Sequence, residues 1–116
     1  MAFFYGVLTL LTAVLHIGFM VLETFLWATP TGMKIFRMTE AQAEATRVLA
    51  MNQGLYNGML AAGLFYAYAT GDYDLAAVFL VFVAVVGVFG AVTVSPKIFF
   101  LQALPAIIAL LIRIIA

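Results

Sequence analysis

The feature that most constrains this chain is the scarcity of charge along its apolar stretches. No charged residue separates Asp74 from Lys97, and Glu23 is the only charged residue before Lys34. Of the 116 residues, 67% are hydrophobic and 9% are charged, whereas a soluble domain is roughly half apolar and about one quarter charged. A chain this short and this apolar could not cover its core with polar surface in water. We therefore expect an integral membrane protein.

Charge and cysteine usage exclude several classes of function. The formal net charge is zero, so the sequence predicts no basic surface for nucleic acid. Cysteine is absent, which excludes disulfides, thiol catalysis and cysteine-ligated metals. The first apolar run, residues 3–28, is longer than the apolar region of a signal peptide, which spans about 7–15 residues. No Lys or Arg precedes it, so we interpret it as a retained transmembrane helix.

The pattern of apolar runs and stop signals predicts an all-α, four-helix transmembrane bundle. The second helix should begin with a capping box, Thr39-x-x-Gln42, and end at Gly71. Pro105 should kink the fourth helix, because proline frees a carbonyl one turn earlier, at Leu101. The expected helices, within a single domain spanning 1–116, are 3–29, 40–70, 73–94 and 96–114.

The basic residues predict the orientation of the bundle. One group lies at the ends joining the first to the second helix and the third to the fourth, and comprises Lys34, Arg37, Arg47 and Lys97. Arg113 lies at the opposite end. Positive-inside bias then places both termini outside the cytoplasm. The partly apolar connection at 30–38 should lie along the lipid headgroups.

Polar side chains inside the apolar helices are the candidate site residues. His16 and Glu23 are seven positions apart, so they lie on one face of the first helix. A charged carboxylate facing lipid is costly, so Glu23 should face the interior of the bundle or be protonated. The middle of the second helix, within Arg47–Gly63, carries Asn52, Gln53, Tyr56 and Asn57.

Depth along each helix predicts which of these residues meet. We counted about 1.5 Å per residue from a cytoplasmic edge taken at Trp27, Arg47 and Pro96. One level, roughly 6–9 Å inside, holds Glu23, Asn52, Gln53 and Gln102. A deeper level, roughly 15–16 Å inside, holds His16 and Asn57. We expect the residues of each level to face one another, with Arg47 as the nearest cation to Glu23.

Each signal also has a structural interpretation. Gly54-x-x-x-Gly58 is a short pattern that marks a packing seam between membrane helices. The amides of the second helix could hold helices together by hydrogen bonds. A single histidine such as His16 is often a hydrogen-bonded core residue, although its usual pKa also suits proton transfer near neutral pH.

Three segments resemble a bacterial four-helix membrane family that is known only as domain of unknown function thirteen-oh-four. They read HIGFMVLETFLW from His16, NQGLYNG from Asn52 and QALPA from Gln102. The resemblance spans nearly the whole chain. It implies the four-helix topology and a bacterial inner membrane, and it implies no activity.

A more distant likeness concerns Arg47 and Asn52, which open a long second helix. This arrangement resembles the membrane-associated eicosanoid and glutathione metabolism family and the styrene oxide isomerases. Those four-helix enzymes form trimers, with active sites between subunits. The second helix here has no histidine, so a haem ligand would have to be His16. Haem and glutathione are suggested by this analogy alone, and the residues themselves require no metal or cofactor.

Three functions fit these residues. In the first, a small apolar or amphipathic molecule enters from the bilayer and is bound or transformed, with Glu23 and His16 as acid–base groups. Its ligand-binding residues would be Arg47, Asn52, Gln53, Tyr56, Asn57 and Gln102. In the second, the protein is a structural or assembly protein with Gly54 and Gly58 in the oligomer seam. In the third, it forms an oligomeric pathway for protons or small solutes. Four helices leave little room for a cavity, so we expect a homo-oligomer, a dimer or trimer, in contact with membrane lipid.

Overall fold

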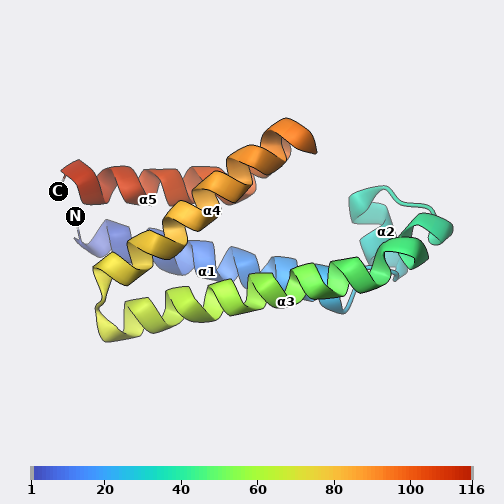
Figure 1. Ribbon diagram of the computed structural model, residues 1–116, viewed down its shortest axis with the longest axis horizontal. Coiled ribbons are helices and arrows are strands. Elements are labelled where there is room, and N and C mark those ends of the chain that lie inside the picture. The colour runs from blue at the N-terminus through green and yellow to red at the C-terminus, as the bar shows by residue number, and fades with distance from the viewer. Residues whose placement is uncertain (1, 116) are drawn as a thin grey trace. The chain divides into compact units, whose positions relative to one another are not determined.

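The computed structural model describes residues 2–115 and is all-α (Figure 1). Within this range the chain forms five α-helices and one short π-helical segment, η1. In chain order they are α1 (Ala2–Thr24), α2 (Pro30–Phe36), α3 (Glu40–Thr70), α4 (Tyr73–Thr93), η1 (Phe99–Ala103) and α5 (Leu104–Ile115).

The start and end of α3 follow the predicted signals. The backbone N–H of Thr39 donates to Gln42 Oε1 at 2.9 Å, and the backbone N–H of Gln42 donates to Thr39 Oγ1 at 3.1 Å. This reciprocal pair is the predicted capping box. At the other end Gly71 has φ +68°, a left-handed conformation that stops the helix. Asp72 then caps α4, because its carboxylate accepts from the backbone N–H of Leu75 at 3.0 Å.

The first helix is shorter than expected. It ends at Thr24 rather than near 29, and the connection predicted at 30–38 contains the short helix α2. Thr29 caps α2 through its hydroxyl, and Pro30 occupies the first helical position, where its missing N–H costs nothing. Gly32 is buried, and a Cβ atom built on it would lie 2.5 Å from the carbonyl oxygen of Trp27. Only glycine therefore lets α2 fold back so closely onto the end of α1.

The predicted fourth helix is also interrupted. The segment before Pro105 is π-helical over Phe99–Ala103, and the backbone N–H of Leu104 donates to the carbonyl of Phe99, five residues earlier. Proline cannot donate a backbone hydrogen bond and crowds the preceding turn. A π-helical turn widens the helix there, so the disturbance predicted at Pro105 takes this form.

The described residues divide into two compact units, and α1 and α3 each contribute to both. One unit comprises residues 2–15 and 61–115, and the other comprises residues 16–60. In the first, α4 packs against η1 and α5 (Figure 1), and a Cβ atom on Gly87 would lie 2.8 Å from Ala103. The Tyr5 hydroxyl donates to the carbonyl of Tyr73 at 2.9 Å, and Arg113 forms an ion pair with Asp74. The prediction that residues 1–116 form a single domain stays a prediction.

Two helices, α1 and α4, are long and apolar enough to span a membrane, and 99–115 form a shorter apolar helix. The most apolar window of α1 is 33% buried within the structure, and that of α4 is 22% buried. The core helix of a soluble protein would be mostly buried. Both helices instead expose most of their apolar surface. The long helix α3 does not meet the same criterion, and polar residues interrupt its middle.

Candidate functional site

The candidate site lies where the C-terminal half of α1 packs against α3, within the unit of residues 16–60. Two glycines of α3 permit this contact. A Cβ atom on Gly54 would overlap Thr24 Oγ1 and would lie 3.1 Å from the Thr24 backbone nitrogen. A Cβ atom on Gly58 would lie 2.5 Å from Met20 Sδ. We call this contact the α1–α3 seam, and define it by Met20, Glu23 and Thr24 of α1 and Gly54, Asn57 and Gly58 of α3.

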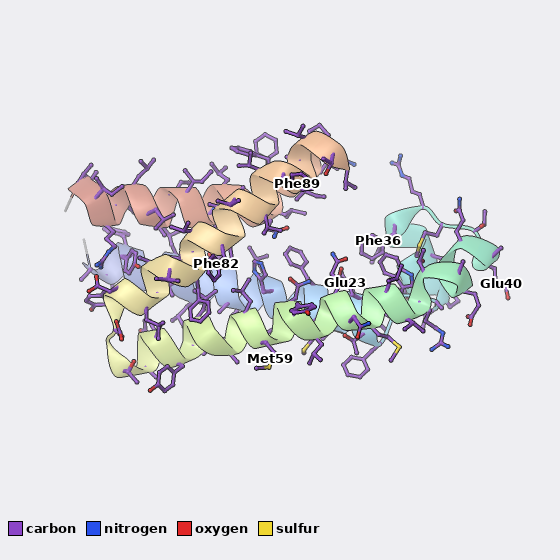
Figure 2. The ribbon with its side chains drawn as sticks, in the orientation of Figure 1. Glu23, Phe36, Glu40, Met59, Phe82 and Phe89 are labelled. Atoms are coloured by element: carbon purple, nitrogen blue, oxygen red, sulfur yellow. The ribbon has the colours of Figure 1, made fainter. Side chains whose placement is uncertain are left out.

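Glu23 is the buried acid of this seam. Glu23 lies on the part of α1 that is next to α3 (Figure 2), and only 8% of the residue is exposed. The side-chain amide Nδ2 of Asn57 donates a hydrogen bond to Glu23 Oε1. Among residues 2–115, the two ion pairs are Arg47–Glu44 and Arg113–Asp74, so no cation neutralises Glu23 there. The acid is therefore held by an amide rather than by a positive charge.

A hydroxyl group lies beside this pair. Thr24 Oγ1 is buried and has no hydrogen-bond partner within the part of the chain that the structure describes. An ionised carboxylate can accept about four hydrogen bonds, and Asn57 supplies one. The seam thus combines unused acceptor capacity on Glu23 with a buried hydroxyl on Thr24 that has no partner among residues 2–115.

The face of α1 that carries Glu23 is polar along its length. His16 has no exposed surface, and its ring meets that of Phe19 edge-on at 5.2 Å between centroids. Thr9 and Thr12 are also buried, and each donates its hydroxyl to the backbone carbonyl four residues earlier, at 2.8 Å. The prediction that His16 and Glu23 share a buried face of the helix is confirmed.

Four predicted site residues lie elsewhere. Arg47, the cation expected nearest to Glu23, is exposed and pairs with Glu44 instead, with 3.3 Å between Nε and Oε1. Asn52 and Gln53 are exposed, and Tyr56 is 77% exposed. These three occupy sides of α3 that do not face α1, because the buried side follows Ala50, Gly54 and Ala61.

The structure also corrects the depth that was predicted for Asn57. It was assigned to the level of His16, whereas it binds Glu23. A Cβ atom on Gly54 would lie 3.2 Å from Glu23 Cβ, so Glu23 is level with Gly54, about one turn before Asn57. Helical side chains lean toward the N-terminus of their helix. Glu23 therefore extends along α1 toward Asn57, and Asn57 extends back along α3 to meet it. Gln102 is half-buried in η1, in the other unit, and its predicted approach to Glu23 stays a prediction.

Gly54 and Gly58 form a packing seam, as predicted, but they contact α1 of the same chain. Thr24 and Met20 occupy the space beside them, and the placement of Gly54 and Gly58 in an oligomer seam stays a prediction. Within residues 2–115 there is no group of three or more His, Asp or Glu side chains that could hold a metal ion. The analogies to haem at His16 and to glutathione stay predictions.

Sequence reasoning missed two contacts. The Trp27 indole Nε1 donates to Thr46 Oγ1 at 2.9 Å, and this bond connects the turn after α1 to α3. The Asp74–Arg113 pair was also missed. The predicted topology contained its signal, because it places the turn after the second helix and the end of the fourth helix on the same side.

Comparison with known proteins identifies the family. The family described as "Protein of unknown function (DUF1304)" matches residues 10–114. The chain belongs to this family. The DUF1304 match includes every residue of the α1–α3 seam, and it confirms the resemblance found in the sequence. The "Uncharacterized protein YpaA" of Lactococcus lactis subsp. lactis (strain IL1403) is 33% identical over 109 residues, which cover 90% of this chain and 92% of YpaA. No solved structure matches. These comparisons do not include the eicosanoid and glutathione metabolism family or the styrene oxide isomerases, and that likeness stays a prediction.

Proposed function

We propose that this DUF1304 protein is an integral membrane protein that binds a small amphipathic molecule, with Glu23 as the acceptor for its polar head group. The observation that carries the proposal is a buried carboxylate with an amide donor and no neutralising cation among residues 2–115. An acid inside a membrane helix is costly and usually marks a site. A head group that donates hydrogen bonds, such as a hydroxyl or an amine, would complete the coordination of Glu23.

Several observations support membrane insertion. Both candidate spans, α1 and α4, expose most of their apolar surface. The family match begins at residue 10, inside α1, so most of this helix belongs to the family domain. With 31 residues, α3 is about 46 Å long and could cross a hydrocarbon core of about 30 Å with its first turns in water. The segment 99–115 would supply a fourth span. The positive-inside bias supports an orientation in a bacterial inner membrane with both termini outside the cytoplasm.

The exposed polar side of α3 supports a homo-oligomer, a dimer or trimer. Asn52 and Gln53 are exposed beside apolar residues, and Tyr56 is 77% exposed. Amides that face lipid without partners are costly. An amide carries both donors and an acceptor, so the same side of a second copy can satisfy it. We therefore propose that this side of α3, rather than Gly54 and Gly58, forms the oligomer contact.

The decisive experiment is analysis of the molecules that copurify with wild type, Glu23→Gln and Glu44→Gln. Glu44 is an exposed acid of α3, so Glu44→Gln is the matched control. All three proteins should be extracted from membranes and compared in oligomer size and melting temperature. Mass spectrometry should then find a small amphipathic molecule with wild type and Glu44→Gln that is depleted at least tenfold with Glu23→Gln. Equal occupancy in well-folded Glu23→Gln would rule out Glu23 as the binding group.

A structural or assembly role is the second candidate, and the α1–α3 seam favours it. The Asn57–Glu23 hydrogen bond joins the two helices at the point where the two glycines bring them together. If the pair serves only this purpose, Glu23→Gln should raise the melting temperature, because it removes a buried charge. It should also leave the set of copurified molecules unchanged. The two candidates thus predict opposite results in the same samples.

A further inference from the structure

We infer that the segment 25–38, which contains α2, is a binding surface for anionic phospholipid headgroups. The inference rests on the membrane insertion proposed above. It does not depend on Glu23 or on any ligand at the α1–α3 seam.

The segment has a defined structure. The Thr29 hydroxyl donates to the carbonyl of Leu26 at 2.6 Å and accepts from the backbone N–H of Gly32 at 3.3 Å. At the end of α2 the backbone N–H groups of Arg37 and Met38 both donate to the carbonyl of Met33. These bonds cap α2 at both ends, so the backbone that carries its exposed side chains is held in place.

An indole connects this segment to α3. Trp27 donates to Thr46 Oγ1 at 2.9 Å, and its ring lies 4.7 Å from that of Phe36, which Figure 2 labels on α2. Phe36 is 40% exposed, Ile35 is 53% exposed and Phe25 is 67% exposed. A tryptophan beside exposed apolar side chains at the end of a candidate span is typical of the boundary between hydrocarbon and headgroups.

The charge of this surface selects the lipid. Lys34 and Arg37 are exposed, and neither makes an ion pair within residues 2–115. No acidic residue occurs between Glu23 and Glu40. Of the exposed acids that follow, Glu44 is paired with Arg47, and Glu40 makes no ion pair among residues 2–115, so the segment keeps two cations against one free acid. Two unpaired cations beside apolar side chains fit a phosphate headgroup with its acyl chains below. The same cations favour the cytoplasmic side of the membrane for this segment.

Trp27 is the only tryptophan of the chain, so its fluorescence reports on this segment. The protein should be reconstituted in bilayers of phosphatidylcholine with a fraction of brominated lipid, either phosphatidylglycerol or phosphatidylcholine, brominated near the glycerol end of the acyl chains. We expect stronger quenching by the brominated phosphatidylglycerol, with a preference of about fivefold for each cation. High salt should reduce the preference, because it screens exposed charges. This measurement on wild type needs no variant.

The variant Lys34→Gln/Arg37→Gln should lose the preference and keep the quenching by phosphatidylcholine. Arg47→Gln is the matched control, because Arg47 is an exposed cation of the same unit that is already paired with Glu44. It should retain the preference. Equal quenching of wild type by the two lipids, in a protein that resists alkaline extraction from membranes, would overturn this inference and leave membrane insertion intact. Release of the protein by alkaline extraction would refute insertion itself.

Discussion

The close approach of α3 to α1 makes Gly54→Ala the most direct test of the α1–α3 seam. The added Cβ atom would overlap Thr24 Oγ1, and would lie 3.1 Å from the Thr24 backbone nitrogen and 3.2 Å from Glu23 Cβ. The threonine hydroxyl could rotate away, but the backbone nitrogen and Cβ move only with the helix. The substitution must therefore push α1 away from α3.

The expected cost follows from two opposing effects. Overpacking of a close contact typically costs about 1–3 kcal/mol, and a contact with backbone belongs near the upper end of this range. Alanine favours a helix over glycine by about 1 kcal/mol. We therefore expect Gly54→Ala to lower the free energy of unfolding by about 2 kcal/mol. In a chain of this size that corresponds to a decrease in melting temperature on the order of 8 °C.

Two other glycines supply the controls for this prediction. Gly18 of α1 has open space where its Cβ would be, so Gly18→Ala should raise stability by about 0.5–1 kcal/mol through helix propensity alone. Gly58 faces the end of the Met20 side chain. Methionine is flexible, so Gly58→Ala should change stability little.

Thermal unfolding in one detergent, followed by circular dichroism or intrinsic fluorescence, would rank the three variants. The melting temperature of Gly18→Ala should lie above that of wild type, that of Gly58→Ala close to it, and that of Gly54→Ala well below it. A melting temperature for Gly54→Ala that equals or exceeds that of Gly18→Ala would refute the packing of α1 on α3 described here.

Two further predictions concern hydrogen bonds of α3. Asn57→Ala removes the donor to the buried Glu23 and should lower the free energy of unfolding by about 2 kcal/mol. Asn52 is exposed, so Asn52→Ala should stay within about 0.5 kcal/mol of wild type in detergent. Equal melting temperatures for the two variants would contradict the Asn57–Glu23 pairing. Thr39→Ala breaks the capping box and should lower the free energy of unfolding by about 1 kcal/mol. Hydrogen exchange should become faster at the backbone amide of Gln42 and stay the same at that of Leu75, which Asp72 caps. Unchanged exchange at Gln42 would argue against the cap.

The limits of α3 and α4 could be predicted because their signals are local. A capping box involves residues three apart, and a left-handed glycine stops a helix wherever its φ requires it. Thr39, Gln42 and Gly71 therefore behave as the sequence indicates. The end of α1 could not be predicted in the same way. It depends on Gly32 packing against the carbonyls of Leu26 and Trp27, and that contact exists only once α2 has folded back.

The candidate site was predicted in part for the same reason. The burial of Glu23 follows from its charge alone, since a carboxylate avoids lipid. Its partner depends on the register between two helices and on the direction in which their side chains lean. The depth estimate ignored that lean, and an error of a few ångströms exchanges Asn57 for Asn52, because the two lie about 7.5 Å apart along α3.

The periodicity of α3 nevertheless contains the information that selects Asn57. Three residues at seven-residue spacing around it, Ala43, Ala50 and Leu64, are 1%, 5% and 0% exposed, and Asn57 occupies the remaining position of that series. Asn52 and Gln53 fall outside it and are exposed. A polar residue within a buried apolar series must find a partner inside the protein. In the proposed membrane, the exposed amides would find theirs on a second copy. The proposal therefore has two separate parts. Asn57 holds Glu23 within the chain, and Asn52 and Gln53 are proposed to contact a second copy.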